Sequence, residues 1–255
     1  MMCQQCRKPL EEEKKTIIRK PGKGCPSIVK VSALPMFLTL SVVTIHQIRT
    51  YQKIASEKRL SWNLLDSQAQ AIMRRNCAFC GRAAKENSQG INGINRIDHS
   101  IPAYTLNNTA PACSDCNQMK HNHSQEDFVA ICKHVATANG LGDFGRYPEA
   151  FRDNFMPKRL SGYLTKSKTY ALSQEDFQAI VAKPCHYCGK ETIPGKHYNG
   201  LDRVVTQVRV YNKDSCVAAC GTCNTMKWRR TSEDFLAQCN RVALYHSCCN
   251  SSEIS

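Results

Sequence analysis

The spacing of apolar residues predicts one helix near the end of each half of the chain. Two series recur at helical spacing: Phe128, Ile131, Cys132 and Val135, and then Phe235, Gln238, Cys239 and Val242, with one polar member. Each series follows a Ser/Thr-x-x-Asp sequence, at Ser124 and Thr231, of the kind that caps a helix N-terminus. We expect both helices to start there. We expect Cys132 and Cys239 to be core thiols, because free cysteine packs as a small hydrophobe.

Shorter patterns predict strands and one further buried element. Residues 92–97 and 199–208 are β-prone and are bounded by asparagine and glycine turn signals, which favours hairpin strands. Residues 33–45 form an apolar run that is shorter than the roughly 20 residues of a membrane-spanning helix. This run also lies too far along the chain for a signal peptide. We therefore expect a buried element and no membrane association.

An internal repeat organises the chain. Superposing the sequence on itself with an offset of about 107 residues aligns two pairs of Cys-x-x-Cys sequences. Between them, Asn92-Gly-Ile-Asn-Arg-Ile aligns with Asn199-Gly-Leu-Asp-Arg-Val. The predicted fold class is α+β, with two tandem zinc-stabilised ββα modules. The division is into a basic N-terminal extension (1–58), a first module (59–140), a linker (141–167), a second module (168–247) and a C-terminal tail (248–255).

The linker between the modules is unusually aromatic. Although it is rich in glycine and charge, it contains Phe144, Tyr147, Phe151 and Phe155. We expect these side chains to pack across the modules, because the transfer of large apolar groups out of water is favourable.

Eight of the sixteen cysteines have the spacing of two metal sites. A Cys-x-x-Cys turn places two thiolates on one ion, and a second such turn completes tetrahedral coordination. Iron–sulfur ligation and disulfides are alternatives, but a duplicated turn followed by glycine is more typical of zinc. Both zinc ions would be structural, because no coordination position is left open for water. The predicted sites are Cys77, Cys80, Cys113 and Cys116, and Cys185, Cys188, Cys220 and Cys223.

A third metal site has weaker support. Cys3-x-x-Cys6 could be completed by Cys25, or by Cys248 and Cys249. This terminal pair has no counterpart in the repeat, so loose thiols at the chain ends are an equally good interpretation.

Charge favours a polyanionic partner. The formal net charge is +14 and the pI is near 9.2, and lysines and arginines that meet phosphates release condensed counterions. Nucleic acid is the leading partner, although acidic proteins and anionic membranes also meet basic surfaces. The basic N-terminal arm suits backbone contact. Near the second cysteine pairs, candidates for phosphate contact or base stacking are Lys120, Lys227, Trp228, Arg229 and Arg230, which could equally be a solvated face.

The segment Ile97-Asp-His-Ser-Ile-Pro102, together with residues 107–120, resembles the HNH endonuclease family over about 45 residues. The resemblance implies a ββα fold around a catalytic Mg²⁺ or Mn²⁺, separate from the zinc. By position, Asp98 and Asn117 would hold the catalytic metal, His99 would be the general base, and Asn108 would orient the histidine. Imidazole suits that role, because near neutral pH it can take a proton from water.

A closer resemblance leaves the role of His99 open. The string Gly-Ile-Asn-Arg-Ile-Asp98 is similar to a phage and large-virus branch in which the next position is often not histidine. In the second module, Val205, Thr206 and Ser215 replace Asp98, His99 and Asn108, whereas the zinc cysteines and Asn224 remain.

Two functions follow from these observations. One is a nuclease in which the first module cuts DNA or RNA and the second module binds it. The other is an inactive scaffold that binds RNA in a ribosome, possibly organellar, or in another ribonucleoprotein. The cysteines require only a reducing or zinc-supplied setting inside a cell, so viral, cytoplasmic and organellar locations all fit.

Overall fold

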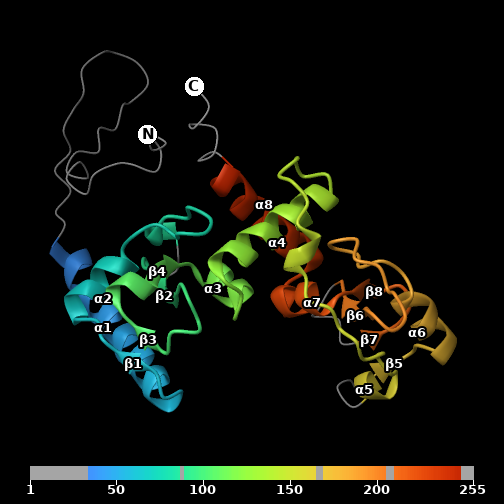
Figure 1. The fold of residues 1–255 in the computed structure, drawn as a ribbon. Coiled ribbons are helices and arrows are strands. Elements are labelled where there is room, and N and C mark those ends of the chain that lie inside the picture. Colours follow the sequence, from blue (N-terminus) through green and yellow to red (C-terminus); the bar gives the residue numbers. More distant parts are fainter. Residues whose placement is uncertain (1–33, 87–88, 165–168, 205–209, 248–255) are drawn as a thin grey trace.

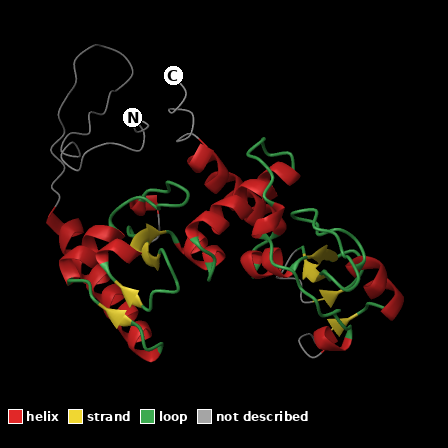
Figure 2. Cartoon of the chain, in the orientation of Figure 1, coloured by secondary structure: helices red, strands yellow, loops and turns green. Residues whose placement is uncertain are grey.

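The computed structural model describes residues 34–86, 89–164, 169–204 and 210–247 (Figure 1). Helices and short two-stranded sheets alternate along the chain, which gives the mixed helix and strand content expected (Figure 2). The helices are α1 (Leu34–Glu57), α2 (Asp66–Met73), α3 (Ser114–Lys120), α4 (Gln125–Ala138), α5 (Ser161–Leu164), α6 (Gln174–Val181), α7 (Gly221–Lys227) and α8 (Ser232–Ser247). Three short 3-10 helices are η1 (Ala84–Glu86), η2 (Leu106–Asn108) and η3 (Pro148–Ala150). The strands are β1 (Ser61–Trp62), β2 (Gly93–Arg96), β3 (Ala103–Tyr104), β4 (Thr109–Ala112), β5 (Thr169–Tyr170), β6 (Gly200–Arg203), β7 (Val210–Tyr211) and β8 (Cys216–Ala219).

Both modules have the same strand pairing. In the first module, β2 pairs antiparallel with β4 and α3 follows directly; in the second, β6 pairs antiparallel with β8 and α7 follows. The ββα order predicted from the sequence is therefore present twice. Each module also has a parallel pair, β1 with β3 and β5 with β7, that the sequence did not predict.

The repeat extends further toward the N-terminus than the sequence match. The hydroxyl of Tyr51 on α1 accepts a hydrogen bond of 3.1 Å from the backbone nitrogen of Ile94. The hydroxyl of Tyr163 on α5 accepts an equivalent bond of 3.1 Å from Leu201. A tyrosine-bearing helix therefore precedes β1 and β5 alike, and α1 and α5 occupy equivalent places.

Helix α1 packs on the first module, although the sequence division placed it in the N-terminal extension. Ile48 and Ala55 of α1 belong to the same buried cluster as Leu64 and Ile94. The apolar run at 33–45 is mostly the start of this helix, where Thr44 is buried and Ile45 is 44% exposed. Packing therefore joins α1 to the first module across the boundary drawn at residue 58.

Helices α4 and α8 pack against each other at the centre of the molecule, with the strands of the two modules on either side (Figure 1). Both helices start at the predicted caps: Ser124 Oγ accepts from Asp127 N, and Thr231 Oγ1 accepts from Asp234 N, each at 3.0 Å. Both residues thereby satisfy an orphan N–H of the first turn.

The cysteines at matching positions of these two helices are core residues, as predicted. Cys132 and Cys239 are fully buried in a cluster that contains residues of both modules. Burial raises the pKa of the Cys132 thiol, so it stays neutral.

The linker packs on both modules, as its aromatic content predicted. The backbone nitrogen of Tyr147 donates to Nδ1 of His134 on α4 at 2.8 Å. Phe151 is buried, and its carbonyl accepts from Lys190 Nζ of the second module at 2.6 Å. Phe155 differs from this pattern, because it is 65% exposed.

Two predictions concern other parts of the chain. The cysteines of the suggested third metal site and the basic N-terminal arm lie outside the described residues. Among the described helices, none has the length and apolar character needed to cross a membrane.

Candidate metal centres and polar pocket

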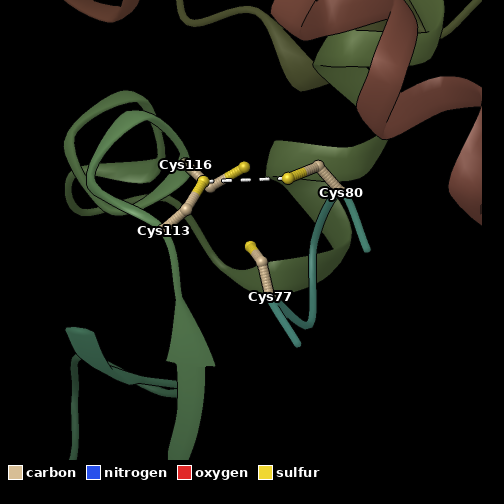
Figure 3. Close-up of side chains that lie close together, drawn as sticks. All are labelled: Cys77, Cys80, Cys113 and Cys116. Atoms are coloured by element: carbon tan, nitrogen blue, oxygen red, sulfur yellow. Dashed lines mark hydrogen bonds between the residues drawn. The ribbon is translucent and has the colours of Figure 1, made fainter. Parts of the chain in front are cut away.

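The first predicted set of cysteines gathers into one buried cluster. The sulfur atoms of Cys77, Cys80, Cys113 and Cys116 lie within 4.8 Å of one another (Figure 3). Cys77 and Cys80 come from a turn, whereas Cys113 and Cys116 lie at the start of α3. The sulfurs of Cys80 and Cys113 are 3.7 Å apart. Tetrahedral zinc with bonds of about 2.3 Å requires a separation of about 3.8 Å between sulfurs. The cluster could therefore hold one structural zinc ion.

The second set repeats this geometry. The sulfurs of Cys185, Cys188, Cys220 and Cys223 also lie within 4.8 Å of one another. Those of Cys188 and Cys220 are 3.7 Å apart. All the described cysteines are free thiols, which excludes disulfides among them. Two four-cysteine clusters are thus present, as predicted.

A left-handed glycine closes the first turn of each cluster. Gly81 has φ 69° and Gly189 has φ 74°, a conformation that other residues rarely adopt. The nitrogen of Gly81 donates to the carbonyl of Cys77 at 2.9 Å, and that of Gly189 donates to Cys185 at 2.8 Å. The chain thereby reverses so that both cysteines of each pair face the same point.

Proximity divides the thiols of each cluster into two kinds. Hydrogen bonds from neighbouring thiols lower the pKa of Cys80 and of Cys185. The same neighbours, with burial, raise the pKa of Cys116, and burial above all raises that of Cys223. Each cluster therefore retains protons that a bound cation would displace.

Each cluster is contacted by the central helix of the other module. Gln238 on α8 donates from Nε2 to the sulfur of Cys116 at 3.0 Å. His134 on α4 donates from Nε2 to the carbonyl of Cys188 at 3.0 Å. The two candidate metal centres and the helix pair therefore form one core.

Arg230, a candidate for phosphate contact from the sequence, is largely buried in this junction. Its Nη2 donates to Asp115 Oδ1 of the first module at 3.1 Å, while Arg82 Nη1 donates to Asp115 Oδ2 at 2.7 Å. Burial opposes ionisation of Asp115, but the bonds from Arg82 and Arg230 lower its pKa. The arginine holds the modules together.

The prediction that Lys120 and Lys227 contact nucleic acid from the surface is wrong. Both side chains are fully buried, so neither ammonium group is on the surface. Lys227 Nζ lies 3.0 Å from Asp202 Oδ2, whereas Lys120 Nζ donates to the carbonyl of Arg96 at 3.2 Å. The sequence suggested surface charge because buried lysines are rare.

Trp228 and Arg229 keep the exposure that a contact surface needs. Trp228 is 49% exposed, and the guanidinium of Arg229 lies 4.7 Å from the centre of its ring. A cation over an exposed aromatic ring offers both charge and a stacking face.

Of the residues matched to HNH enzymes, Asp98 and Asn108 shape one loop. Asp98 is exposed, and its Oδ1 accepts from the nitrogen and the hydroxyl of Ser100, both at 2.7 Å. The hydroxyl bond is the main cause of a lowered pKa of Asp98. Asn108 is buried; its Oδ1 accepts from Asp98 N at 2.8 Å and its Nδ2 donates to Asp98 O at 3.1 Å. Asn108 thus fixes the loop backbone that carries His99.

His99 lines a polar cavity of about 430 Å³, here called the His99 pocket. Its basic lining residues are Lys58, Arg96, His99 and His121, and no described residue that lines it is acidic. Two buried atoms in its lining residues have no hydrogen-bond partner, His99 Nε2 and Asn95 Oδ1. A buried polar atom without a partner is costly, so the pocket is suited to a ligand that supplies one.

The neutral His99 ring carries its proton on Nε2. Arg96 Nη2 lies 3.4 Å from Nδ1 of His99, and because a guanidinium only donates, the ring proton resides on Nε2. Burial, and then the charges of Lys120 and Arg96, lower the pKa of His99 to about 4. The imidazole is therefore neutral at pH 7.

Asn117 shares the pocket with His99, but Asp98 does not line it. Asn117 Oδ1 accepts from Asn95 Nδ2 at 2.6 Å. The structure therefore brings His99 and Asn117 together and leaves Asp98 on the outer side of the loop. Lys58, in the turn just after α1, also lines the pocket, and no sequence pattern marks it as a site residue.

Comparison with known proteins gives one informative match. No known family matches the chain, and neither does any solved structure. The chain is similar to an uncharacterized protein, R423, of Acanthamoeba polyphaga mimivirus, with 31% identity over 203 residues. The match covers 77% of this chain but only 36% of the viral protein, so the chain spans about a third of that relative's length. The name of this relative does not state an activity.

Proposed function

We propose that the chain is a zinc-stabilised nucleic-acid-binding protein in which the His99 pocket of the first module binds a phosphodiester. The two cysteine clusters each hold one structural zinc ion. The first module is a candidate endonuclease of the HNH type, and the second module binds without cutting.

The observation that carries this proposal is the lining of the His99 pocket. Lys58 and Arg96 bring positive charge to the cavity, and no described residue that lines it is acidic, which favours an anion. The unpartnered N–H at Nε2 of His99 can donate to a phosphate oxygen. The net charge of +14 supports a polyanion rather than a single small anion.

Cleavage, unlike binding, would require His99 to act as a base and a metal ion to be held nearby. To act as general base, His99 must accept a proton at a ring nitrogen near the attacking water, so the proton on Nε2 or the bond from Arg96 has to move. Asp98 and Asn117 have the oxygen ligands that Mg²⁺ or Mn²⁺ prefers. Asp98 Oδ1 accepts from Ser100 and Asn117 Oδ1 accepts from Asn95, and of these two residues only Asn117 lines the pocket.

A second candidate is a non-catalytic binder, for example an RNA-binding component of a ribosome or another ribonucleoprotein. The outward position of Asp98 favours it, because the residue expected to hold the metal is absent from the pocket lining. The second module also keeps both its ββα order and its cysteines without the histidine.

Binding titrations of labelled DNA and RNA at several salt concentrations test the shared part of both candidates. Affinity should fall steeply with salt, and His121→Ala should weaken it several-fold, whereas His46→Ala on the exposed surface of α1 should not. A flat salt dependence for both nucleic acids, or equal effects of the two variants, would contradict the proposal.

A further inference from the structure

One face of α1 lines two adjoining cavities. Residues at helical spacing along α1 and just after its end all line the His99 pocket: Gln47, Thr50, Tyr51, Ile54 and Lys58. Gln47 and Tyr51 also line a second cavity of about 610 Å³. Asn117 on α3 is the third residue that the two cavities share. The cavities are therefore neighbours along α1.

The second cavity, here called the amide pocket, differs from the His99 pocket in chemistry. Its charged lining residues are one arginine and one glutamate, Arg82 and Glu86. Amide side chains predominate among its polar groups, and Met73, Ile91 and Ala112 supply apolar surface. A neutral group with apolar faces and hydrogen-bonding edges fits such a lining, and a nucleobase has this character.

The second module shows which part of α1 is scaffold. There the equivalent helix α5 is the short segment Ser161–Leu164, yet it keeps the tyrosine whose hydroxyl binds the adjacent strand. This tyrosine contact is therefore the feature that the two helices share. Helix α5 is too short to match the rest of this face, which runs from Gln47 to Lys58, just after the end of α1, and lines the two cavities of the first module.

We propose that a single-stranded nucleic acid lies along α1, with a phosphate in the His99 pocket and a neighbouring unstacked base in the amide pocket. This inference rests on the proposed function and names its substrate class. Within a duplex, a base is stacked and paired, so its faces and edge are not available to a pocket. Lys58, exposed at the end of the helix, binds the backbone beside the His99 pocket.

Two lysines, one in α1 and one just after its end, provide a matched test. Lys58 lines the His99 pocket, whereas Lys53 is a surface residue paired with Glu57. Gln118 lines the amide pocket, and Gln178 on α6 is an exposed glutamine for comparison. All four of these side chains are exposed, so all the variants should fold.

The experiment is fluorescence anisotropy with zinc-loaded protein, without chelator or added divalent metal, on short thymidine and uridine oligonucleotides and a duplex of equal length. Single strands should bind more tightly than the duplex. Lys58→Ala should reduce the salt slope by about one, and Gln118→Ala should weaken single-strand binding roughly five-fold, as for the loss of one hydrogen bond. Lys53→Ala and Gln178→Ala should match the wild type.

Two results would overturn the inference. Equal or tighter binding of the duplex, or equal effects of Lys58→Ala and Lys53→Ala, would remove the single-strand path while leaving the phosphodiester pocket in place. Failure of the wild type to bind any of the probes would remove both.

Discussion

The buried ion pair of the second module gives a sharp stability prediction. Lys227 is fully buried and Asp202 is 6% exposed, and Lys227 Nζ lies 3.0 and 3.2 Å from the two carboxylate oxygens. Asp202→Asn keeps an acceptor for the hydroxyl of Tyr187 but leaves the lysine buried without a counter-charge. Breaking a buried pair in this way costs about 3 to 5 kcal/mol.

The lower end of that range is expected here. The carbonyl of Arg203 still accepts from Lys227 Nζ at 2.8 Å, which solvates the ammonium in part. A loss of about 3 kcal/mol is roughly a hundred-fold change in the folding equilibrium. Replacing the pair together, as Asp202→Asn with Lys227→Met, should recover most of the loss, because no buried charge then remains.

Chemical denaturation at a fixed free zinc concentration measures these differences, because metal binding itself shifts apparent stability. A loss below about 1 kcal/mol for Asp202→Asn, or a double variant as unstable as the single one, would refute the role assigned to the pair.

Three further predictions concern the clusters and the first module. Native mass spectrometry should find two zinc ions on residues 34–247, and chelation should unfold the protein; fewer ions with no unfolding would contradict the two centres. Gly81→Ala should destabilise more than Gly189→Ala in thermal melts, because both have positive φ but a Cβ at Gly81 would meet Tyr245 at 2.7 Å; equal losses would contradict this packing. Burial lowers the pKa of Lys120 from 10.5 to about 8, so between these values the unfolded state binds more protons and stability rises with pH. Asn95→Asp, which places a carboxylate at the position of Asp202, should flatten that rise in denaturation midpoints, and an unchanged slope would count against it.

The features that the sequence predicted are those encoded by local patterns. The cysteine pairs, the ββα order and the caps at Ser124 and Thr231 depend on residues close together in the chain. Spacing and capping chemistry therefore suffice to identify them.

Long-range packing produced what the sequence did not predict. The sequence suggested that Arg230 contributes surface charge, but its partner Asp115 lies in the other module. Lys58 lines a pocket only because α1 packs against β2. The Tyr51 hydroxyl of α1 there accepts a hydrogen bond from the backbone of Ile94 on β2. No local pattern reports such contacts, because they depend on how the modules and helices assemble.

Nicking of plasmid DNA, and of a matched RNA, in the presence of Mg²⁺ or Mn²⁺ tests the catalytic role of the first module most directly. His99→Ala should lower the rate by about 10² to 10⁴ while zinc content stays unchanged, and Thr206→Ala at the matching position of the second module should leave the rate intact. Because the pKa of His99 is lowered to about 4, the wild type should still cut in mildly acidic buffer, where an ordinary histidine is protonated. Cleavage that survives His99→Ala would contradict the assignment of the base, and a wild type that binds but never cuts would leave the first module, like the second, as a binding scaffold.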